Sequence, residues 1–410
     1  MIIHKGFKYR LVPTPAQKRM LLQHGGNTRF LWNNLLANNI EYYEKEKKFN
    51  FSHVMITSLP QLKEEFEFLK LSYSQSLQKV GMNLDDALNR FLKWRKIDNS
   101  VGFPKFKKKS KSRDSFHCPQ GWETGKKYVK IPKIGKIPWI KHRPLRGRPR
   151  SITITQDGDQ WYCSVLCEIT IKEKLKKDKN IVGVDVGLTS FAILSDGTRI
   201  QRERITKQYE NKLAQEQRRL SRKKKGSQNR TKQRGIVQRV HRKIRNSRKD
   251  FLHKTTHCMI TKYDGFCLES LNIQGMMKNK KLSKNIADVA WYEFKRQLEY
   301  KSLWNWKHFV QIDQWFPSTK KCSACGNWKK IKLNERTYVC KKCGFVMDRD
   351  LNAAVNILKE GKNTLGHRGI NACGDGKVHG SLVGYGQTDR CPSMKQEKEY
   401  TENCIEAPVL

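Results

Sequence analysis

Two short apolar segments of the chain carry a carboxylate where a buried strand is expected. Asp185 lies within the segment 181–188, and Glu269 directly follows another apolar run. Val and Ile favour a strand, whereas a buried charge is costly unless it is paired or binds a metal. The segment 190–194, followed by an Asp-Gly turn, predicts a second strand that forms a hairpin with the first. An edge strand with Asp185 facing water is the alternative.

A third carboxylate, Asp350, opens a predicted helix. Ala354, Ile357 and Leu358 follow it by four, seven and eight residues, so Asp350 shares their apolar stripe. Asp348 falls on the other side and is better placed to cap the helix, and capping is the alternative for Asp350 too. Three such acids suit Mg²⁺, and two such ions can activate a water and stabilise the leaving oxygen in phosphodiester cleavage.

Four cysteines have the spacing of a metal site. Cys322-x-x-Cys325 and Cys340-x-x-Cys343 are separated by fourteen residues, and a glycine follows each pair. Four thiolates make a closed tetrahedral site, so the sequence predicts Zn²⁺ bound by these side chains, with redox dithiols as the alternative. The other eight of the twelve cysteines are scattered, and we interpret them as structural or incidental.

The net charge of the 410-residue chain calls for a polyanionic partner. Lys and Arg total 83 against 38 Asp and Glu, which gives +45. Nucleic acid is the expected partner, because each neutralised phosphate releases a counterion. A membrane surface is the competing partner, but no apolar run of about 18 residues and no signal peptide is present. We therefore expect a soluble, cytoplasmic, nucleoid-associated protein of a prokaryotic cell.

Two segments concentrate the basic residues. Segment 101–109 interleaves aromatic residues with lysines, a mixture that can hold a phosphate backbone and stack bases. A predicted helical pair over 206–262, broken at 226–229, has fifteen Lys and Arg and no acid between Arg218 and Lys249. A solvated linker and an exposed helical pair are the respective alternatives. The candidate nucleic-acid contacts in these segments are Lys105, Lys107, Lys108, Lys109, Arg222, Lys223, Lys224, Lys225, Arg242 and Arg245.

The remaining elements follow from periodicity and capping signals. Thr14, Pro15 and Gln17 predict a helix start with a capping box. A helix bundle with no catalytic role is the alternative for the helical module that follows. The other expected elements are a strand at 2–12, helices around 31–40, 59–69 and 77–94, a small β-barrel or sheet from short strands over about 115–171, a polar basic loop at 276–285 and a mobile Gly-rich tail from about 361.

Several motifs occur in a fixed order along residues 1–359. They include G-V-D-V-G at 183–187, the Glu after a strand, the paired CxxC turns and D-R-D-x-N-A-A-x-N-I at 348–357. G-F-P-K-F-K-K-K at 102–109 and W-x-x-F-x-x-x-L-x-Y-K at 291–301 belong to the same set. Together they resemble TnpB, the family of transposon-encoded RNA-guided nucleases related to compact type V CRISPR effectors.

The resemblance implies an α+β multidomain protein with an RNase H-like (RuvC) α/β nuclease domain. Asp185, Glu269 and Asp350 would be its catalytic acids, which bind Mg²⁺ or Mn²⁺, and Gln78 and Lys79 lie where the family reads a DNA motif. The implied domains are a wedge β-barrel strand at 1–12, a helical recognition module at 13–114, the wedge β-barrel at 115–178, the RuvC-like domain at 179–318 and 347–360, a zinc-ribbon target-nucleic-acid-binding insert at 319–346, and a disordered tail at 361–410.

The implied activity is RNA-guided cleavage of double-stranded DNA next to a short flanking motif. A guide RNA from the transposon end (ωRNA) would pair with the target strand, and one site would cut both strands in turn. The protein would be a monomer in its RNA complex. Two alternatives stay open: an RNA-guided repressor that does not cut, against which the intact acids count, and an unguided transposase.

Overall fold

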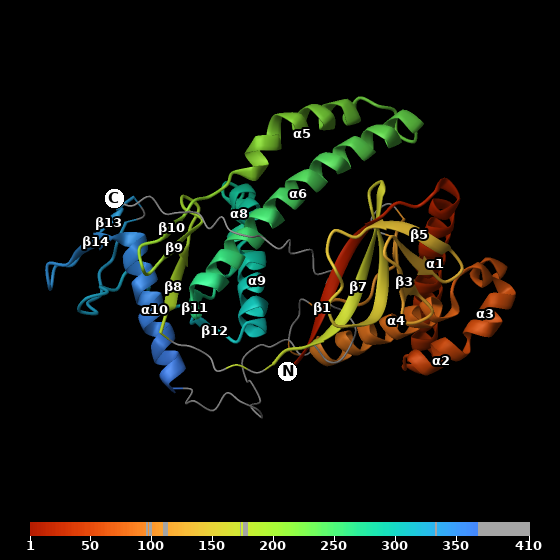
Figure 1. The fold of residues 1–410 in the computed structure, drawn as a ribbon, viewed down its shortest axis with the longest axis horizontal. Helices are drawn as coiled ribbons and strands as arrows, with labels where there is room; N and C mark the ends of the chain where they lie inside the picture. The colour runs from red at the N-terminus through yellow and green to blue at the C-terminus, as the bar shows by residue number, and fades with distance from the viewer. Residues whose placement is uncertain are drawn as a thin grey trace. The chain divides into compact units, whose positions relative to one another are not determined.

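A computed structural model describes residues 1–95, 97, 101–109, 114–172, 174, 179–332 and 334–367. The chain divides into two compact units, one over Met1–Ile171 and one that begins at Lys172 (Figure 1). Each unit has its own sheet and its own cores of buried side chains, so each is described by itself. None of the described helices is long and apolar enough to cross a membrane.

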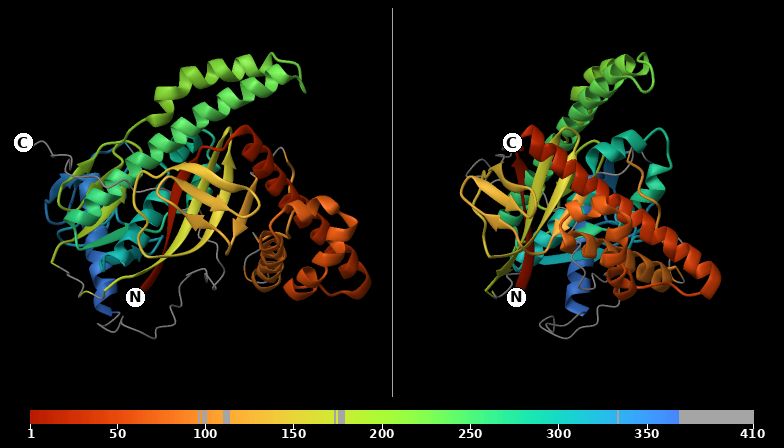
Figure 2. Two further views of the ribbon diagram at one scale, coloured as in Figure 1. Left: turned by 45° about the vertical axis from the view of Figure 1, so that its right-hand side comes forward. Right: turned by 90° about the vertical axis from the view of Figure 1, so that its right-hand side faces the viewer.

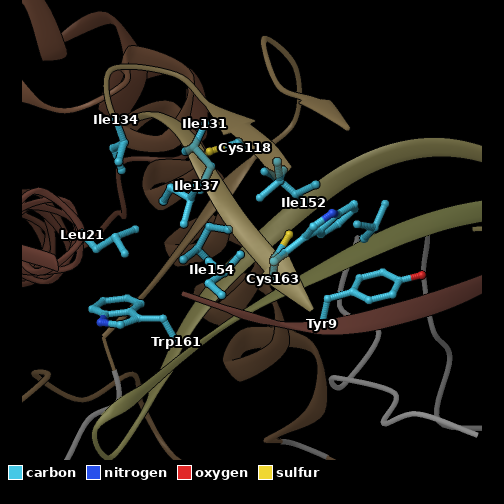
Figure 3. Packing of buried hydrophobic residues seen from close by; sticks show 14 of the residues in the cluster. Tyr9, Leu21, Cys118, Ile131, Ile134, Ile137, Ile152, Ile154, Trp161 and Cys163 are labelled. Atoms are coloured by element: carbon cyan, nitrogen blue, oxygen red, sulfur yellow. The ribbon is translucent and has the colours of Figure 1, made fainter. Parts of the chain in front are cut away.

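The first unit contains a seven-stranded antiparallel sheet. Its strands are β1 (Ile2–Leu11), β2 (Ser115–Cys118), β3 (Glu123–Thr124), β4 (Tyr128–Ile131), β5 (Gly135–Ile140), β6 (Arg148–Asp157) and β7 (Gln160–Thr170). They pair in the order β2-β6-β7-β1-β5-β4-β3, so the N-terminal strand completes the sheet as predicted. Tyr9, Ile154 and Trp161 lie in the buried core on this sheet (Figure 3).

The helices of this unit begin directly after β1. The predicted capping box is confirmed: Thr14 Oγ1 accepts the Gln17 amide at 3.3 Å, and Gln17 Oε1 accepts the Thr14 amide at 3.1 Å. The helical segments are α1 (Pro15–Glu46), α2 (Ser52–Thr57), α3 (Leu59–Glu65), the 3₁₀ helix η1 (Glu67–Leu71) and α4 (Ser74–Trp94). Leu31, Leu77 and Leu84 are buried in their shared core, which confirms the predicted apolar spacing.

The second unit has a mixed five-stranded sheet. Its strands are β8 (Ile181–Val186), β9 (Ala192–Leu194), β10 (Arg199–Ile200), β11 (Gly265–Glu269) and β12 (His308–Ile312), in the order β10-β9-β8-β11-β12. The antiparallel pairing of β8 with β9 confirms the predicted hairpin. β8, β11 and β12 run parallel, so their carboxyl ends meet at one edge of the sheet.

The two faces of this sheet are covered by different helices. Val182 and Val184 of β8 join a core with residues of α6 (Gln228–Lys262) and α9 (Trp291–Trp304). Helix α10 (Arg349–His367) packs against β8, β11 and β12 on the other face (Figure 1). Because side chains alternate along a strand, Gly183 and Asp185 point to the α10 face.

The predicted basic helical pair is present as α5 (Ile205–Ser221) and α6, which lie side by side (Figure 2). The expected break falls at Gly226, which has a positive φ of 85°, and Ser227 caps α6 by accepting the Arg230 amide at 3.1 Å. Arg230 Nη1 also donates to the carbonyls of Leu220 and Lys223, at 2.8 and 2.7 Å. One side chain therefore joins both helices and their connecting turn.

Two expectations about irregular segments need correction. The loop expected at 276–285 is shorter, because α7 (Ile273–Met277) and α8 (Ser283–Val289) occupy its ends. The tail expected from 361 is also wrong at its start, because α10 continues through His367 and Gly361 is buried. The rest of that expected tail, 368–410, lies outside the described residues.

Candidate functional site

Asp185 and Glu269 lie on neighbouring parallel strands at the same level. The register pairs Val184 with Leu268, so Asp185 and Glu269 are one step beyond that pair. Side chains at the same step of adjacent strands point to the same face. Both carboxylates therefore point to the α10 face at the carboxyl edge of the sheet, as the strand predictions require.

A close contact between β8 and α10 brings the third acid to this edge. A Cβ on Gly183 would overlap the Ala354 carbonyl and lie 2.6 Å from the Leu358 amide nitrogen, so only glycine fits there. Asp350 is one helical turn before Ala354, and Asp185 is two residues after Gly183. Asp185 and Asp350 accordingly line the same pocket, of about 210 Å³.

The pKa shift of Asp185 is consistent with two carboxylates that lie close to it. Burial, together with the carboxylates of Glu269 and Asp350, raises the pKa of Asp185 well above its usual range. Burial also raises the pKa of Glu269, although the hydrogen bond that Ser318 Oγ donates to Glu269 Oε1 opposes the rise. A cation bound beside Asp185 would favour its ionised form, which burial and the two neighbouring carboxylates disfavour.

Asp348 has the capping role expected for it. Its Oδ1 accepts the amides of Asp350 and Leu351 at 3.1 and 3.0 Å, and its Oδ2 pairs with Arg199 at 2.9 Å. Asp350 is different, because its carboxylate lies in the pocket.

Two arginines line the pocket with Asp185 and Asp350, whereas Glu269 is not among the lining residues. Arg349 Nη2 lies 2.8 Å from Asp350 Oδ1, and Arg336 Nη1 lies 3.7 Å from Asp350 Oδ2. The complete lining is Asp185, Val186, Gly187, Leu188, Thr189, Ser190, Ile193, Thr319, Arg336, Arg349 and Asp350. Carboxylates beside guanidinium groups can hold a cation and a phosphate at once.

The four predicted cysteines form one cluster. Their sulfurs all lie within 4.8 Å of one another, with Cys322 to Cys343 at 3.8 Å and Cys325 to Cys340 at 3.6 Å. A tetrahedral ion about 2.3 Å from each sulfur would separate the sulfurs by about 3.8 Å. All four sulfurs gather in one group at about these separations, so the cluster fits one shared zinc ion better than two separate redox dithiols.

The cysteine module, which we define as residues 319–346, is anchored to α10 by two asparagines. Asn352 Oδ1 accepts the Ser323 amide at 2.9 Å, and its Nδ2 donates to the Lys321 carbonyl at 2.8 Å. Asn356 Nδ2 donates to the carbonyls of Ser318 and Lys321, at 2.8 and 2.6 Å. The module therefore connects through Ser318 to Glu269.

Sequence reasoning missed five side chains of this site: Ser318, Asn352, Asn356, Arg336 and Arg349. The two asparagines had a signal, since they are four residues apart and thus share one face of the helix. Ser318 ends the sequence Phe-Pro-Ser at 316–318, and nothing in that sequence indicates a hydrogen bond to Glu269. No local pattern marks Arg336, because it reaches the pocket from the cysteine module.

The lysines of segment 101–109 lie on an ordered, exposed segment. Trp32 Nε1 donates to the Lys105 carbonyl at 3.1 Å, and Asn33 bonds both the amide and the carbonyl of Lys107. Lys107 Nζ lies 3.6 Å from the centre of the Trp32 ring. Lys105, Lys107, Lys108 and Lys109 are all exposed, so they remain candidates for phosphate contact.

The other candidate contacts differ in exposure. Arg222, Lys224, Lys225 and Gln78 are exposed, and Lys223, Arg242 and Arg245 are partly exposed. Lys79 is buried, with 9% of its surface exposed, so it offers little surface to a nucleic acid in this conformation. The apolar face of α4 explains the burial, because Val80 beside it is also buried in the helical core.

The chain matches three protein-family models and several known proteins. The family described as "Probable transposase" matches residues 164–280, "Cas12f1-like, TNB domain" matches 291–357, and "Helix-turn-helix domain" matches 1–48. A "Putative RNA-guided DNA endonuclease" of Streptomyces pristinaespiralis is 35% identical over 383 residues, which cover 91% of this chain and 92% of that protein. The similarly named InsQ of Escherichia coli (strain K12) is 32% identical over 391 residues, with 90% and 94% covered.

A solved structure of a Cas12f1–sgRNA–target DNA complex also aligns. It is 16% identical and covers 87% of this chain and 99% of that chain, with a TM-score of 0.34. This structural similarity is too low to support a conclusion about function.

Proposed function

Because the chain belongs to the TnpB family of RNA-guided DNA endonucleases, we propose that it is itself a Mg²⁺-dependent, RNA-guided nuclease that cuts double-stranded DNA. The observation that carries this proposal is the group of three carboxylates from β8, β11 and α10 at one edge of the sheet. A chain that only bound DNA would have no use for a carboxylate, Asp185, whose pKa is raised by burial and by the neighbouring Glu269 and Asp350.

The donor set fits a hard divalent cation. Asp185, Glu269 and Asp350 offer carboxylate oxygens and no nitrogen or sulfur, as Mg²⁺ or Mn²⁺ prefers. When bound, such ions would lower the pKa of a water and stabilise the leaving oxygen of a phosphodiester. In this proposal these three residues hold the ions, and Asp348 remains the helix cap.

The other polar side chains of the pocket orient the reacting groups. Ser318 donates to one oxygen of Glu269 and so fixes the rotation of that carboxylate. Arg349 and Arg336 contact Asp350 and can turn their remaining N–H groups to a phosphate. Both arginines thereby offset the repulsion between a DNA phosphate and the acids.

We propose domain boundaries that match this function. We assign the RNase H-like (RuvC) nuclease domain to residues 179–318 and from 347 to the end of α10, with the cysteine module as its zinc-ribbon insert for target nucleic acid. Residues 1–12 and 115–178 would form the wedge β-barrel, and 13–114 the helical recognition module. The chain would act as a monomer in its RNA complex.

The guide RNA and the target would bind to the basic segments. We propose that the hairpin of α5 and α6 and segment 101–109 contact phosphates of an RNA from the transposon end. That RNA would pair with the target strand, and Gln78 would lie near a short flanking motif on the DNA duplex. Because Lys79 is buried, it is a weaker candidate than Gln78 for contact with that DNA motif.

The chain offers a matched test of the acid assignment. Asp185→Asn, Glu269→Gln and Asp350→Asn should each abolish Mg²⁺-dependent cutting by the RNA complex and leave RNA binding intact. Asp348→Asn is the control: asparagine also caps helices, so its cutting rate should stay near that of the wild type. Full cutting by Asp185→Asn would refute the assignment, as would an equal loss in all four variants.

A further inference from the structure

Trp315 is the most exposed large hydrophobic side chain in the described part of the chain, with 84% of its surface accessible. An exposed hydrophobic residue alone needs no explanation. The position of Trp315 is what distinguishes it, because it follows β12 at the sheet edge where the acids lie.

The loop that carries Trp315 begins and ends beside Glu269. Ile312 is paired in register with Glu269 across β11 and β12, and its carbonyl accepts Ser270 Oγ at 2.8 Å. At the other end, Ser318 donates to Glu269 itself. Trp315 is three residues from each anchor, so its Cα lies within about 11 Å of theirs, at ~3.5 Å per residue.

Hydrogen bonds within the loop hold the backbone that carries Trp315. The Trp315 amide donates to Asp313 Oδ1 at 2.7 Å, and the Phe316 amide donates to the Asp313 carbonyl at 3.3 Å. Phe316 packs inward against the core that contains Ile312 and Ile357. Trp315 itself is exposed, so its ring is accessible to a ligand without a change in the packing of Phe316.

We propose that Trp315 stacks on a nucleobase of the DNA strand that enters the pocket of Asp185 and Asp350, and so positions that strand for cutting. The proposal rests on the proposed nuclease function. An aromatic ring can stack on any base, so this contact suits an enzyme whose sequence choice lies in a guide RNA. Thr319, four residues further on, lines the pocket, which joins the stacking surface to the site of cutting.

Tryptophan emission gives a binding readout that needs no cutting. The protein–RNA complex would be titrated with a short thymidine oligonucleotide in Ca²⁺, with wild type and Trp315→Phe compared. The wild type should show quenching that is missing in Trp315→Phe, which lacks this one of the ten tryptophans. Equal quenching in both, or quenching only by the matching uridine oligonucleotide, would overturn the proposal.

Cutting rates then test the consequence of stacking. Trp315→Ala should slow Mg²⁺-dependent cutting about tenfold, whereas Trp315→Phe should keep most of the rate because phenylalanine also stacks. Leu303→Ala is the control, since Leu303 is an exposed apolar residue that precedes β12 at the opposite edge. Unchanged cutting by Trp315→Ala would overturn the proposal. If the wild-type complex does not cut at all, the nuclease function fails, and the quenching result still decides whether Trp315 stacks.

Discussion

Asn356 is a single side chain that connects two predicted sites. It is 2% exposed, and its amide group donates to the Ser318 and Lys321 carbonyls at the start of the cysteine module. Ser318 in turn holds Glu269. The position of a proposed catalytic carboxylate therefore depends on an uncharged residue of α10.

Asn356→Ala should destabilise the second unit and slow cutting. The change leaves the buried Ser318 carbonyl without its side-chain donor, which costs about 1–3 kcal/mol, and it loosens the segment that holds Ser318. The Lys321 carbonyl loses one of its two donors and keeps the bond from Asn352. Urea denaturation and cutting rates would be measured together. Thr364→Ala is the control on the same helix, because it removes only a bond to the Glu360 carbonyl one turn back. Equal effects of the two changes would contradict this role for Asn356.

At the residue scale, the types of the site residues were predictable and their contacts were not. Asp185 and Glu269 stand out because a charge interrupts an apolar run. Ser318 and Arg336 carry no such signal, because their roles depend on which segments the fold brings to Glu269 and Asp350. The burial of Lys79 is likewise a tertiary effect, since a helix-surface lysine looks the same in sequence whether or not its face is packed.

At the scale of elements, the contact between β8 and α10 determines where the acids meet. Gly183 lets the helix backbone approach the strand, and Gly361 does the same against Cys267 of β11. These two close contacts hold α10 against the sheet and so place Asp350 beside Asp185.

Gly183→Ala should therefore destabilise the second unit by about 2 kcal/mol or more, because the added methyl overlaps backbone atoms of Ala354 and Leu358. Gly235→Ala is the matched control: it lies in α6, no atom lies within 4 Å of its added Cβ, and alanine favours a helix by up to about 1 kcal/mol. Urea denaturation should separate the two variants in opposite directions. Similar losses in both would show that close approach at Gly183 is not the cause.

The cysteine module should depend on its metal for order. Among the described residues of the module, the buried cluster contains Tyr338 besides the cysteines, with Ile331 and Phe345 partly buried, which is a small core to hold a fold without a metal. Removal of zinc by a chelator should release one equivalent of zinc per chain and lower both stability and cutting. Retained cutting with no zinc bound would contradict the structural role.

The secondary structure was more predictable than its packing. The capping box at Thr14, the hairpin of β8 and β9 and the break at Gly226 all follow from local chemistry, and the structure has each of them. The end of α10 was misjudged because glycine in the sequence suggests a helix end, whereas Gly361 continues the helix to pack on Cys267. The parallel order of β8, β11 and β12 depends on long-range pairing, which no local pattern specifies.

At the scale of the whole molecule, a net charge of +45 accompanies the three carboxylates Asp185, Glu269 and Asp350 at one edge of a sheet. The excess of lysine and arginine supports tight but sequence-independent contact with phosphates. Such contact cannot choose a target by itself. A bound guide RNA would select the target sequence. The positive charge and the carboxylates are therefore both consistent with an RNA-guided nuclease.

The most direct test of this account is to change the guide and observe the cut. The protein would be purified with its transposon-end RNA, and the segment of that RNA that pairs with DNA would be replaced by a new sequence. The account predicts Mg²⁺-dependent double-strand cuts that move to DNA matching the new sequence and that disappear without RNA. Cutting that ignores the guide, or that persists without RNA, would contradict it and indicate an unguided DNA-acting enzyme.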